Sequence, residues 1–330
     1  MSDIAVIIYT ENDRLHIKRC LERLAPLAPS QIFIVDCFST DATQEIVTQY
    51  SAEISSCGAK ESRLMPLAEA IGTVVHRQVA AGSNPSTVGS IAYSDEHCKG
   101  VCPTISIVEH EWPGNQASQF QWALDNLPIG AKWILRLDAD EYLTDELIAE
   151  IKEKLPQMED GVDGVVLKRR HVVGWLGDCW IKRGMYPARI LRLFRRGHGR
   201  SDMKIMDEHI VVDGKVVEFD NDFVDHSLIS FEDWKVKHCG YGKREAQSYL
   251  SGERSTGEKA AKKAAYYKLP PYFRAFAYFC IRYFLKLGFL DGLPGFRWHF
   301  WQGLWYRWLV DREIGKLKEC KRQQVMAPKK

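Results

Sequence analysis

Acidic side chains gather directly after an apolar run in the segment WILRLDADEYL, residues 133–143. Asp138, Asp140 and Glu141 fall within four positions, and carboxylates held this close repel one another unless a cation or water screens them. Two carboxylates with one residue between them at a strand end can point the same way, and such oxygen ligands suit Mg²⁺ or Mn²⁺. A divalent cation bound there would also hold and neutralise a diphosphate. From the spacing alone, an acidic turn that caps the following helix is an equal alternative.

Short apolar runs lead into several of the polar positions. The runs IAVIIYT (residues 4–10), QIFIVD (31–36) and KWILRLD (132–138) have the composition of strands buried on both faces. Helical patterns follow them, and this alternation predicts a mostly parallel α/β sheet. Ligands of such sheets bind beyond the carboxyl ends of the strands, which is where Asp36 and Asp138 stand.

Other parts of the chain depart from this alternation. Residues 51–107 are rich in Ser, Gly and Ala, so we expect an insertion, partly loop, with a helix near 64–71. Residues 165–220 favour strands, and Asp213-Gly214 between two β-rich runs predicts a hairpin of antiparallel strands added to the sheet. The polar, lysine-rich residues 252–263 predict an exposed linker.

Aromatic and basic residues dominate the segment 264–320. Its first helical pattern carries Tyr272, Phe276, Phe279 and Tyr283 on one face and Arg274, Arg282 and Lys286 on another, and its second carries Trp301, Trp305 and Trp308. Basic residues among aromatics on short amphipathic helices favour a membrane surface. The alternative is that the aromatic faces pack on the rest of the chain. No run of 18 apolar residues predicts a membrane-spanning helix.

The composition bounds the class of protein. The chain has 330 residues, 45% hydrophobic and 27% charged, which is ordinary for a soluble globular protein. Its net charge of +2 gives no argument for a nucleic-acid partner, and we predict none. Nine scattered cysteines make no regular framework, which indicates a reducing compartment. Asp3 stands where a signal peptide has basic residues, so we expect a cytoplasmic location.

Six motifs stand in order along the chain: VIIYTEND, IVDCFSTD, GNQASQFQWAL, LRLDADEYL, RLFRRGHGR and MDEHIVVDG. Their order and spacing resemble the family 2 glycosyltransferases, in the branch that builds lipopolysaccharide cores and exopolysaccharides. The resemblance covers residues 1–50 and 108–245. It implies the GT-A fold, a Rossmann-like mixed sheet that binds nucleotide-diphospho-sugars, over residues 1–250. The aromatic and basic composition of residues 264–320 adds amphipathic, membrane-associating helices after this domain.

The resemblance implies roles for residues at the strand ends. Thr10 and Asn12 would contact the nucleotide, and Asp36 would hydrogen-bond the base, typically uracil. Asp138 and Asp140 would form the motif that binds the metal and the diphosphate.

Other implied roles belong to the second half of the chain. Glu208 falls where this branch usually has a His-Glu pair, so it would be the general base that deprotonates the acceptor hydroxyl. Asp207 is the competing base. His226, in FVDHSL, would be a third metal ligand or an acceptor contact, although a lone histidine is more often structural. Apart from the resemblance, Arg192, Arg195 and Arg196 form a basic cluster. They would clamp a phosphate of the donor or of a lipid-linked acceptor, or simply alternate in exposure along their strand.

The chain also departs from the family pattern. Asp207 stands where the family usually has a histidine, TEND replaces the common TYNE, and Gln121 replaces a common asparagine. These changes remove an aromatic residue near the base and weaken any role of Gln121 in nucleotide binding.

These observations predict an inverting glycosyltransferase that uses Mg²⁺ or Mn²⁺ and a nucleotide-diphosphate sugar, with a UDP-sugar expected first. The expected acceptor is a lipid-linked or cell-surface glycan, and the expected location is the inner face of the cell membrane. Two alternatives stay open. A sugar nucleotidyltransferase would carry a glycine-rich loop after the first strand, where YTENDRLHIKRC has no glycine. A non-catalytic membrane scaffold with a decayed sugar-nucleotide fold is compatible with the departures at 121 and 207.

Overall fold

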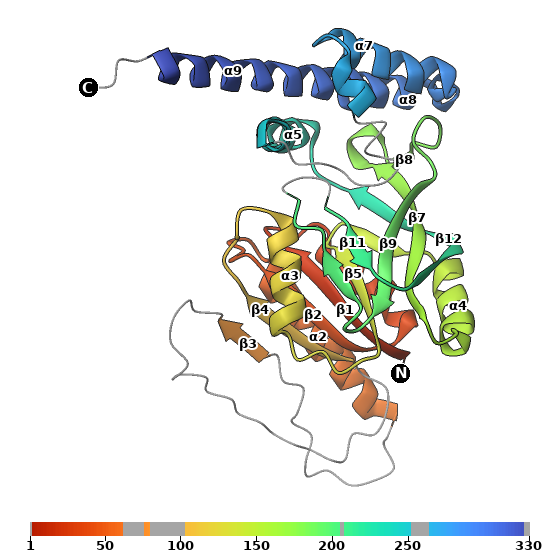
Figure 1. Cartoon of the computed structure of the whole chain (residues 1–330). Helices are drawn as coiled ribbons and strands as arrows, with labels where there is room; N and C mark the ends of the chain where they lie inside the picture. Colours follow the sequence, from red (N-terminus) through yellow and green to blue (C-terminus); the bar gives the residue numbers. More distant parts are fainter. Residues whose placement is uncertain (1, 62–75, 80–102, 205–207, 252–263, 327–330) are drawn as a thin grey trace.

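One mixed sheet organises the chain (Figure 1). The computed structural model describes residues 2–61, 76–79, 103–204, 208–251 and 264–326. In sheet order the strands are β3 (His76–Val79), β4 (Thr104–Glu109), β2 (Pro29–Asp36), β1 (Ser2–Thr10), β5 (Trp133–Asp138), β9 (Ala188–Arg195), β7 (Val162–Val173), β12 (Lys215–Ser227) and β6 (Glu141–Leu143).

The first half of the sheet is parallel. Strand β1 runs parallel to β2 and β5, and β4 runs parallel to β2 and β3. Helices α1 (Ile17–Leu24), α2 (Thr43–Glu61) and α3 (Gln116–Asn126) connect these strands. The run from Ile4 to Ile8 is fully buried, as its unbroken apolar composition predicts for a strand covered on both faces. The predicted α/β sheet is therefore confirmed.

The second half of the sheet mixes directions. Strand β9 is antiparallel to β5 and β7, β12 is parallel to β7, and β6 is antiparallel to β12. Only Ala139 and Asp140 separate β5 from β6. Helix α4 (Asp145–Lys154) then starts at Thr144, whose hydroxyl accepts a hydrogen bond from the Leu147 amide. The acid-bearing turn is thus held by a buried strand on one side and a capped helix on the other.

The hairpin predicted at Asp213-Gly214 does not form. Strand β11 (Ile210–Val212) pairs instead with β10 (Gly199–Ser201), in a separate two-stranded ribbon, and β12 pairs with β7. The turn has other reasons for its composition. Arg200 binds both carboxylate oxygens of Asp213, and a Cβ atom at Gly214 would lie 2.0 Å from Oδ2 of Asp163.

The expected insertion at 51–107 has boundaries that fall inside regular elements. Helix α2 continues to Glu61, and β4, which begins at Thr104, pairs in register with β2 and lies one strand in from the edge of the sheet. The helix expected at 64–71 and the linker expected at 252–263 lie outside the described residues.

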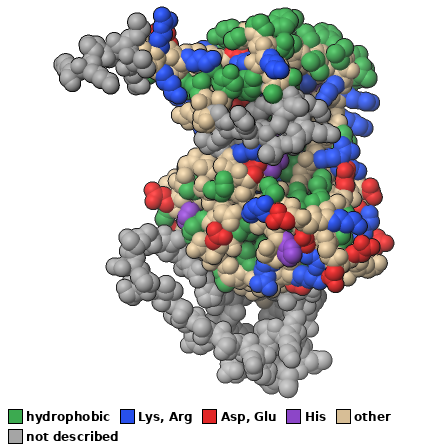
Figure 2. All heavy atoms as spheres, in the orientation of Figure 1, with side chains coloured by type: hydrophobic (Ala, Val, Ile, Leu, Met, Phe, Trp, Pro, Cys, Tyr) green, Lys and Arg blue, Asp and Glu red, His purple; other side chains and the backbone are tan. Residues whose placement is uncertain are grey.

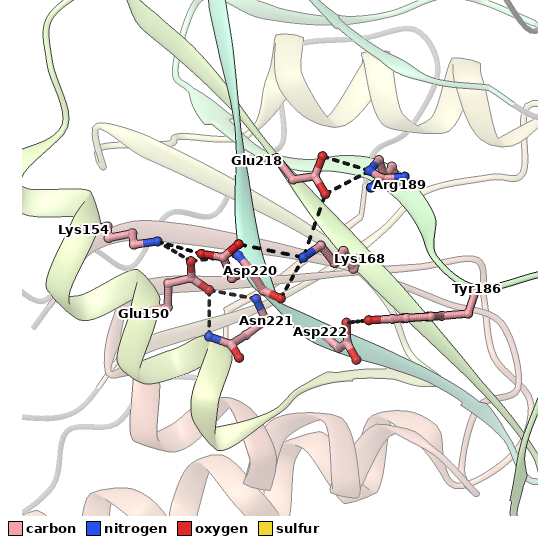
Figure 3. Close-up of polar contacts among 9 residues, drawn as sticks. All are labelled: Glu150, Lys154, Lys168, Tyr186, Arg189, Glu218, Asp220, Asn221 and Asp222. Carbon is pink, nitrogen blue, oxygen red and sulfur yellow. Dashed lines mark hydrogen bonds and ion pairs between the residues drawn. The ribbon is translucent and has the colours of Figure 1, made fainter. Parts of the chain in front are cut away.

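Strand β12 has an irregular stretch that α4 compensates (Figure 3). Its register against β7 shifts between Glu218 and Asp222. The carboxylate of Glu150 accepts the backbone N–H groups of Asp220 and Asn221, at 2.8 and 2.9 Å. Because buried backbone groups need partners, this contact allows β12 to bend and still be anchored.

The remaining helices form a layer beyond one end of the sheet (Figure 1). This layer contains α5 (Phe231–Ser251), α7 (Phe273–Cys280), α8 (Gly292–Trp298) and α9 (Tyr306–Met326), with π-helical turns at Ile281–Leu285 and His299–Trp305. Short elements complete the fold: 3-10 turns at Ala25–Leu27, Leu155–Gln157, Gly174–Leu176 and Gly288–Asp291, and β8 (Cys179–Trp180), which pairs with β7. Helix α9 packs along α5 through Tyr306, Leu309 and Val310.

Two of the three tail cations expected on an exposed face are buried. Arg274 binds Asp311, and both side chains are at most 3% exposed. Arg282 is also buried and hydrogen-bonds Gln302. These arginines hold the tail helices to one another, because a buried guanidinium needs hydrogen-bond acceptors wherever its helix packs. Lys286 is exposed as expected.

Candidate active site

The predicted acids meet at one edge of the sheet. Register pairs Thr10 with Asp36 and Tyr9 with Asp138, so the ends of β2 and β5 flank the end of β1. The hydroxyl of Thr10 donates to Oδ1 of Asp36 at 2.7 Å, and both residues are buried. Two of the predicted nucleotide-binding residues therefore touch each other.

The carboxylate of Asp36 is surrounded by neutral donors. Besides Thr10, it accepts the backbone N–H and the hydroxyl of Ser39 and the side-chain amide of Gln44, at 2.5–2.8 Å. Four donors match the acceptor capacity of a carboxylate. A nucleobase N–H that donates to Asp36 would therefore have to replace one of these donors.

Asn12 joins the loops that follow β1 and β2. Its φ of +59° is left-handed, a conformation that asparagine tolerates better than most residues. Its side-chain oxygen accepts the backbone N–H groups of Thr40 and Asp41 at 2.9 and 3.2 Å, and its own N–H donates to Ser39. The residue predicted to contact the nucleotide thus also shapes the rim of the site.

Two buried arginines stand beside the acid pair. Arg192 of β9 lies 3.3 Å from Oδ2 of Asp138 and 2.5 Å from Oε1 of Glu141. Arg136 of β5 lies 2.7 Å from Oε1 of Glu208 and 3.8 Å from Oδ1 of Asp138. Sequence reasoning missed Arg136, although an arginine two residues before Asp138 in an apolar strand must share its face.

Arg136 also links Glu208 to Asp138. The side chain of Glu208 is 11% exposed, and its partner Arg136 is 3% exposed. The predicted base and the predicted metal motif are therefore brought together by one guanidinium. Asp207, the competing base, lies outside the described residues.

The two aspartates of the pair differ in their surroundings. Burial opposes the charge of Asp138, but Arg192 and Arg136 outweigh it and lower the pKa of that carboxyl. Burial and the neighbouring Asp225 raise the pKa of Asp140 to about 6. Within the described part of the chain, the Asp140 carboxylate has no hydrogen-bond or ion-pair partner. Asp140 is thus the acid that remains available to a cation.

His226 is close to the acid turn, but its ring is engaged elsewhere. Its backbone N–H donates to the carbonyl of Asp140 at 2.9 Å. Nδ1 lies 3.0 Å from Arg19 and Nε2 lies 2.7 Å from Asp178, and burial lowers the pKa of the imidazole. Metal ligation would have to break one of these contacts. Among the described residues, no group of three or more His, Cys, Asp or Glu could hold a metal ion by itself.

The other predicted positions are divided between ends of the sheet. Arg195 pairs in register with Trp133 at the opposite end of β5, where it binds the carbonyls of Val162 and Glu159. Only Arg192 of that basic cluster belongs to the site. Gln121 accepts the backbone N–H of Ser201 and so ties α3 to β10.

A mixed sheet with acids at the carboxyl ends of β2 and β5 is the arrangement that the family resemblance implies for a GT-A glycosyltransferase. No family model matches the chain. A curated relative, the lipopolysaccharide core biosynthesis glycosyltransferase LpsC of Rhizobium meliloti (strain 1021), is 28% identical over 212 residues, which cover 63% of this chain and 70% of the relative. The resemblance to family 2 glycosyltransferases, the GT-A fold and the enzyme class, a glycosyltransferase, are thereby confirmed.

Solved structures align along most of the chain at low identity. The mannosyltransferase PcManGT from Pyrobaculum calidifontis, in complex with GDP-Man and Mn²⁺, is 14% identical with a TM-score of 0.48, over 94% of this chain and 86% of its own. TarS 1–349 of S. aureus, in complex with UDP-GlcNAc, is 12% identical with a TM-score of 0.42, over 98% and 92%.

Proposed function

We propose that the protein transfers a sugar from a nucleotide-diphosphate donor, a UDP-sugar in the first place, to an acceptor hydroxyl with inversion. The convergence of Asp138, Asp140 and Glu208 beside the buried Asp36 carries this proposal. At one edge of the sheet these residues supply carboxylates for a cation with a diphosphate, a base for a hydroxyl and a hydrogen-bonded carboxylate for a nucleoside.

The acid pair fits a hard divalent cation. Asp140 has no partner among the described residues, and Oδ1 of Asp138 is buried without a hydrogen-bond donor. Mg²⁺ and Mn²⁺ are commonly held by one or two carboxylates, with substrate phosphates completing the shell, so a third protein ligand from His226 is not required. When bound, the ion would supply positive charge against the diphosphate.

Glu208 is the proposed general base. It accepts the proton of the acceptor hydroxyl while that oxygen forms a bond to the anomeric carbon. The bond from the anomeric carbon to the diphosphate oxygen breaks at the same time, and its electron pair leaves with the nucleoside diphosphate. One in-line displacement inverts the anomeric configuration. Arg136 orients the carboxylate through the 2.7 Å contact.

Nucleoside-diphosphate release tests this proposal. Purified protein is incubated with a panel of UDP-sugars, Mn²⁺ and extracted membrane lipids, and the product is identified by mass spectrometry. We expect UDP release that depends on metal and disappears in Asp140→Ala. Equal release by Asp140→Ala would reject it. A nucleotidyltransferase would instead consume a nucleoside triphosphate, and a scaffold would show no metal-dependent heat with UDP in calorimetry.

An exposed apolar face on the tail supports a second part of the proposal, membrane docking (Figure 2). Leu285 and Leu293 are 77% and 60% exposed, which is unusual for leucines in ordered helices. Further large apolar residues exposed on the tail are Leu269, Tyr272, Phe273, Phe276, Ile281, Phe284, Leu287, Phe289, Leu290, Phe296 and Trp308. The opposite face, with Trp298, packs on Val173 and Trp234, so the tail both packs and leaves an apolar face open.

We infer that this face lies in the headgroup region of the cytoplasmic leaflet. Exposed Lys268, Lys286 and Arg297 accompany the apolar residues, as expected for attraction to anionic lipids. No helix in the described ranges is long and apolar enough to cross a bilayer. Docking of this kind would bring the site to a lipid-linked acceptor.

Vesicle sedimentation tests the docking. With vesicles containing phosphatidylglycerol, we expect the double variant Leu285→Asp/Leu293→Asp to lower the bound fraction about tenfold or more, since each buried leucine contributes about 1.5–3 kcal/mol. Val216→Asp, a change at an exposed apolar residue of β12, is the matched control. Unchanged binding of the double variant would reject this surface.

A further inference from the structure

One cation of the tail lacks an anion although it is buried. Arg282 lies in the π-helical turn that follows α7, and the residue is only 3% exposed. Within the described ranges, no carboxylate lies within 4 Å of its guanidinium. Burying a charge without a compensating partner is costly, and an unsatisfied buried group of this kind marks a place for a bound ion or ligand.

The unused donors of Arg282 stand on one edge of the guanidinium. Nη1 donates to the side-chain oxygen of Gln302 and to the hydroxyl of Tyr278, the latter at 3.4 Å. Nε and Nη2 are buried and have no acceptor in the described part of the chain. Their N–H groups run parallel, and this edge of an arginine side chain matches two oxygens of one anion.

Arg274, eight residues earlier, uses the same edge to bind an acid of the chain. Its Nε and Nη2 both donate to Oδ1 of Asp311, the first at 2.7 Å. Burial opposes the charge of Arg274, but Asp311 outweighs it and raises the pKa of that guanidinium. Burial instead lowers the pKa of Arg282, and Tyr278 offsets this only in part. The edge is therefore filled in Arg274 and unfilled in Arg282.

Other cations lie close to Arg282. The guanidiniums of Arg282 and Arg307 lie 5.2 and 5.3 Å from the centre of the same Tyr278 ring. Arg307 has a carboxylate partner, Glu245, at 2.5 Å. Lys286, one turn after Arg282, is exposed. Among these residues three cations accompany one carboxylate, so the cluster attracts a further anion.

The surroundings of the cluster favour a phosphate as this anion. Ile281 and Leu285 are neighbours of Arg282 along the helix and are 44% and 77% exposed, on the apolar face of the tail. Helices that dock on a membrane by such a face lie in the headgroup region, which is rich in lipid phosphates. Tyr278 and Gln302, which contact Nη1, are partly exposed, so the guanidinium lies just beneath the surface.

We propose that the edge of Arg282 formed by Nε and Nη2 binds the phosphate of an anionic membrane phospholipid. The contact is bidentate and charge-assisted, and it supplies the negative charge that this guanidinium lacks. This inference rests on the membrane docking of the proposed function. It adds recognition of a lipid headgroup to a surface that is otherwise held by apolar contact.

Binding of a soluble lipid tests this site. Calorimetry on the full chain uses a short-chain phosphatidylglycerol below its micelle concentration, for wild type, Arg282→Met and Arg282→Lys. Arg322→Met removes the same charge from an exposed position of α9 and is the matched control. We expect both Arg282 variants to weaken binding about tenfold, because lysine keeps the charge but not the two parallel donors. The control should retain the affinity of wild type.

Stability without lipid gives the second readout. Arg282→Met removes an uncompensated buried charge at the cost of the hydrogen bonds of Nη1, so we expect a melting temperature no lower than that of wild type. Arg274→Met leaves Asp311 without its partner, and we expect its melting temperature to fall by about 5 °C or more. Arg282→Gln repeats both measurements should the methionine variant fold poorly. Equal falls for the Arg274 and Arg282 variants would show a structural role and overturn the proposal.

Two further outcomes also overturn it. Full affinity for the lipid in Arg282→Met or in Arg282→Lys would exclude the bidentate contact. Inorganic phosphate that binds as tightly as the lipid, and loses its affinity in Arg282→Met, would assign the edge to free phosphate. The docking proposal fails separately, when wild-type protein does not sediment with phosphatidylglycerol vesicles.

Discussion

Asp36 and the Asp138–Asp140 pair both end parallel strands, yet the protein treats them differently. Asp36 receives four neutral hydrogen-bond donors from its own neighbourhood. Asp138 is held by arginines, and Asp140 has no partner in the described part of the chain. Neutral donors fix the direction of a carboxylate, which suits recognition of a nucleobase. A carboxylate whose charge is not compensated suits a charged ligand, such as a divalent cation that also binds a diphosphate.

The largest expected effect comes from removing the charge of Asp140. Asp140→Asn should lower kcat/KM for sugar transfer about 1000-fold, because it removes the charge that the cation needs at the diphosphate. Steady-state assays with saturating Mn²⁺ measure this. Asp160→Asn, at a fully exposed acid, is the control. Full activity in the Asp140 variant would mean that the open carboxylate has no part in the reaction.

Removing Arg136 should damage both stability and activity. Arg136→Met leaves Glu208 and Asp138 without their shared guanidinium in a buried place. We expect a loss of about 3–5 kcal/mol in the free energy of unfolding, the usual cost of breaking a buried ion pair. Urea unfolding followed by circular dichroism measures it, with Arg189→Met, at an exposed ion pair, as control. A loss below that of the control would contradict the buried cluster.

Substitution of Asp36, which is held by neutral donors, should have a smaller effect. Asp36→Asn turns an acceptor into a donor opposite Ser39 or Gln44. We expect a cost of about 1–3 kcal/mol in unfolding free energy, the cost of an unsatisfied buried polar contact. The affinity for UDP should fall as well, with uridine affected equally. Glu111→Gln, at an exposed acid, serves as control, and an unchanged stability would refute the four-donor arrangement.

The smallest expected effect is a gain, not a loss, in the free energy of unfolding. Because the pKa of Asp140 in the folded protein is about 6, above its value in an unfolded chain, ionised Asp140 destabilises the metal-free fold above that pH. With EDTA present, Asp140→Asn should therefore be more stable than wild type at pH 7.5 by about 1–3 kcal/mol. The gain should shrink between pH 6 and pH 4 and vanish below. A gain that does not depend on pH would point to a cause other than this titration.

The sequence predicted the features that depend on short stretches. Asp36 and Asp138 follow buried apolar runs, and a strand end can be read from such a run alone. The ion pair of Arg136 with Glu208 could not be predicted, because the two residues lie 72 positions apart and no local pattern links them. The Asp213-Gly214 hairpin failed for a similar reason, since β12 finds its neighbour in β7 and not in the preceding strand.

The burial of the tail arginines could not be predicted from the local sequence either. On a helical wheel, Arg274 lies with other cations on a polar face, but the acid that it binds, Asp311, belongs to a helix 37 positions further on. The exposed apolar face was readable in part, because its aromatic content exceeded what one packing face needs. Which of its residues face outward depended on how α7, α8 and α9 pack together.

Helix α5 has a consequence for how this protein can be altered. Trp234 of this helix packs on Val173 of β7, and Glu245, further along the helix, binds Arg307 and Tyr306 of α9. A chain shortened after α5 would lose those contacts and uncover the tryptophans beside Val173. We therefore expect that the two segments cannot be exchanged between relatives as independent modules. Chimaeras should tolerate a new tail only when its residues that face α5 are transplanted with it.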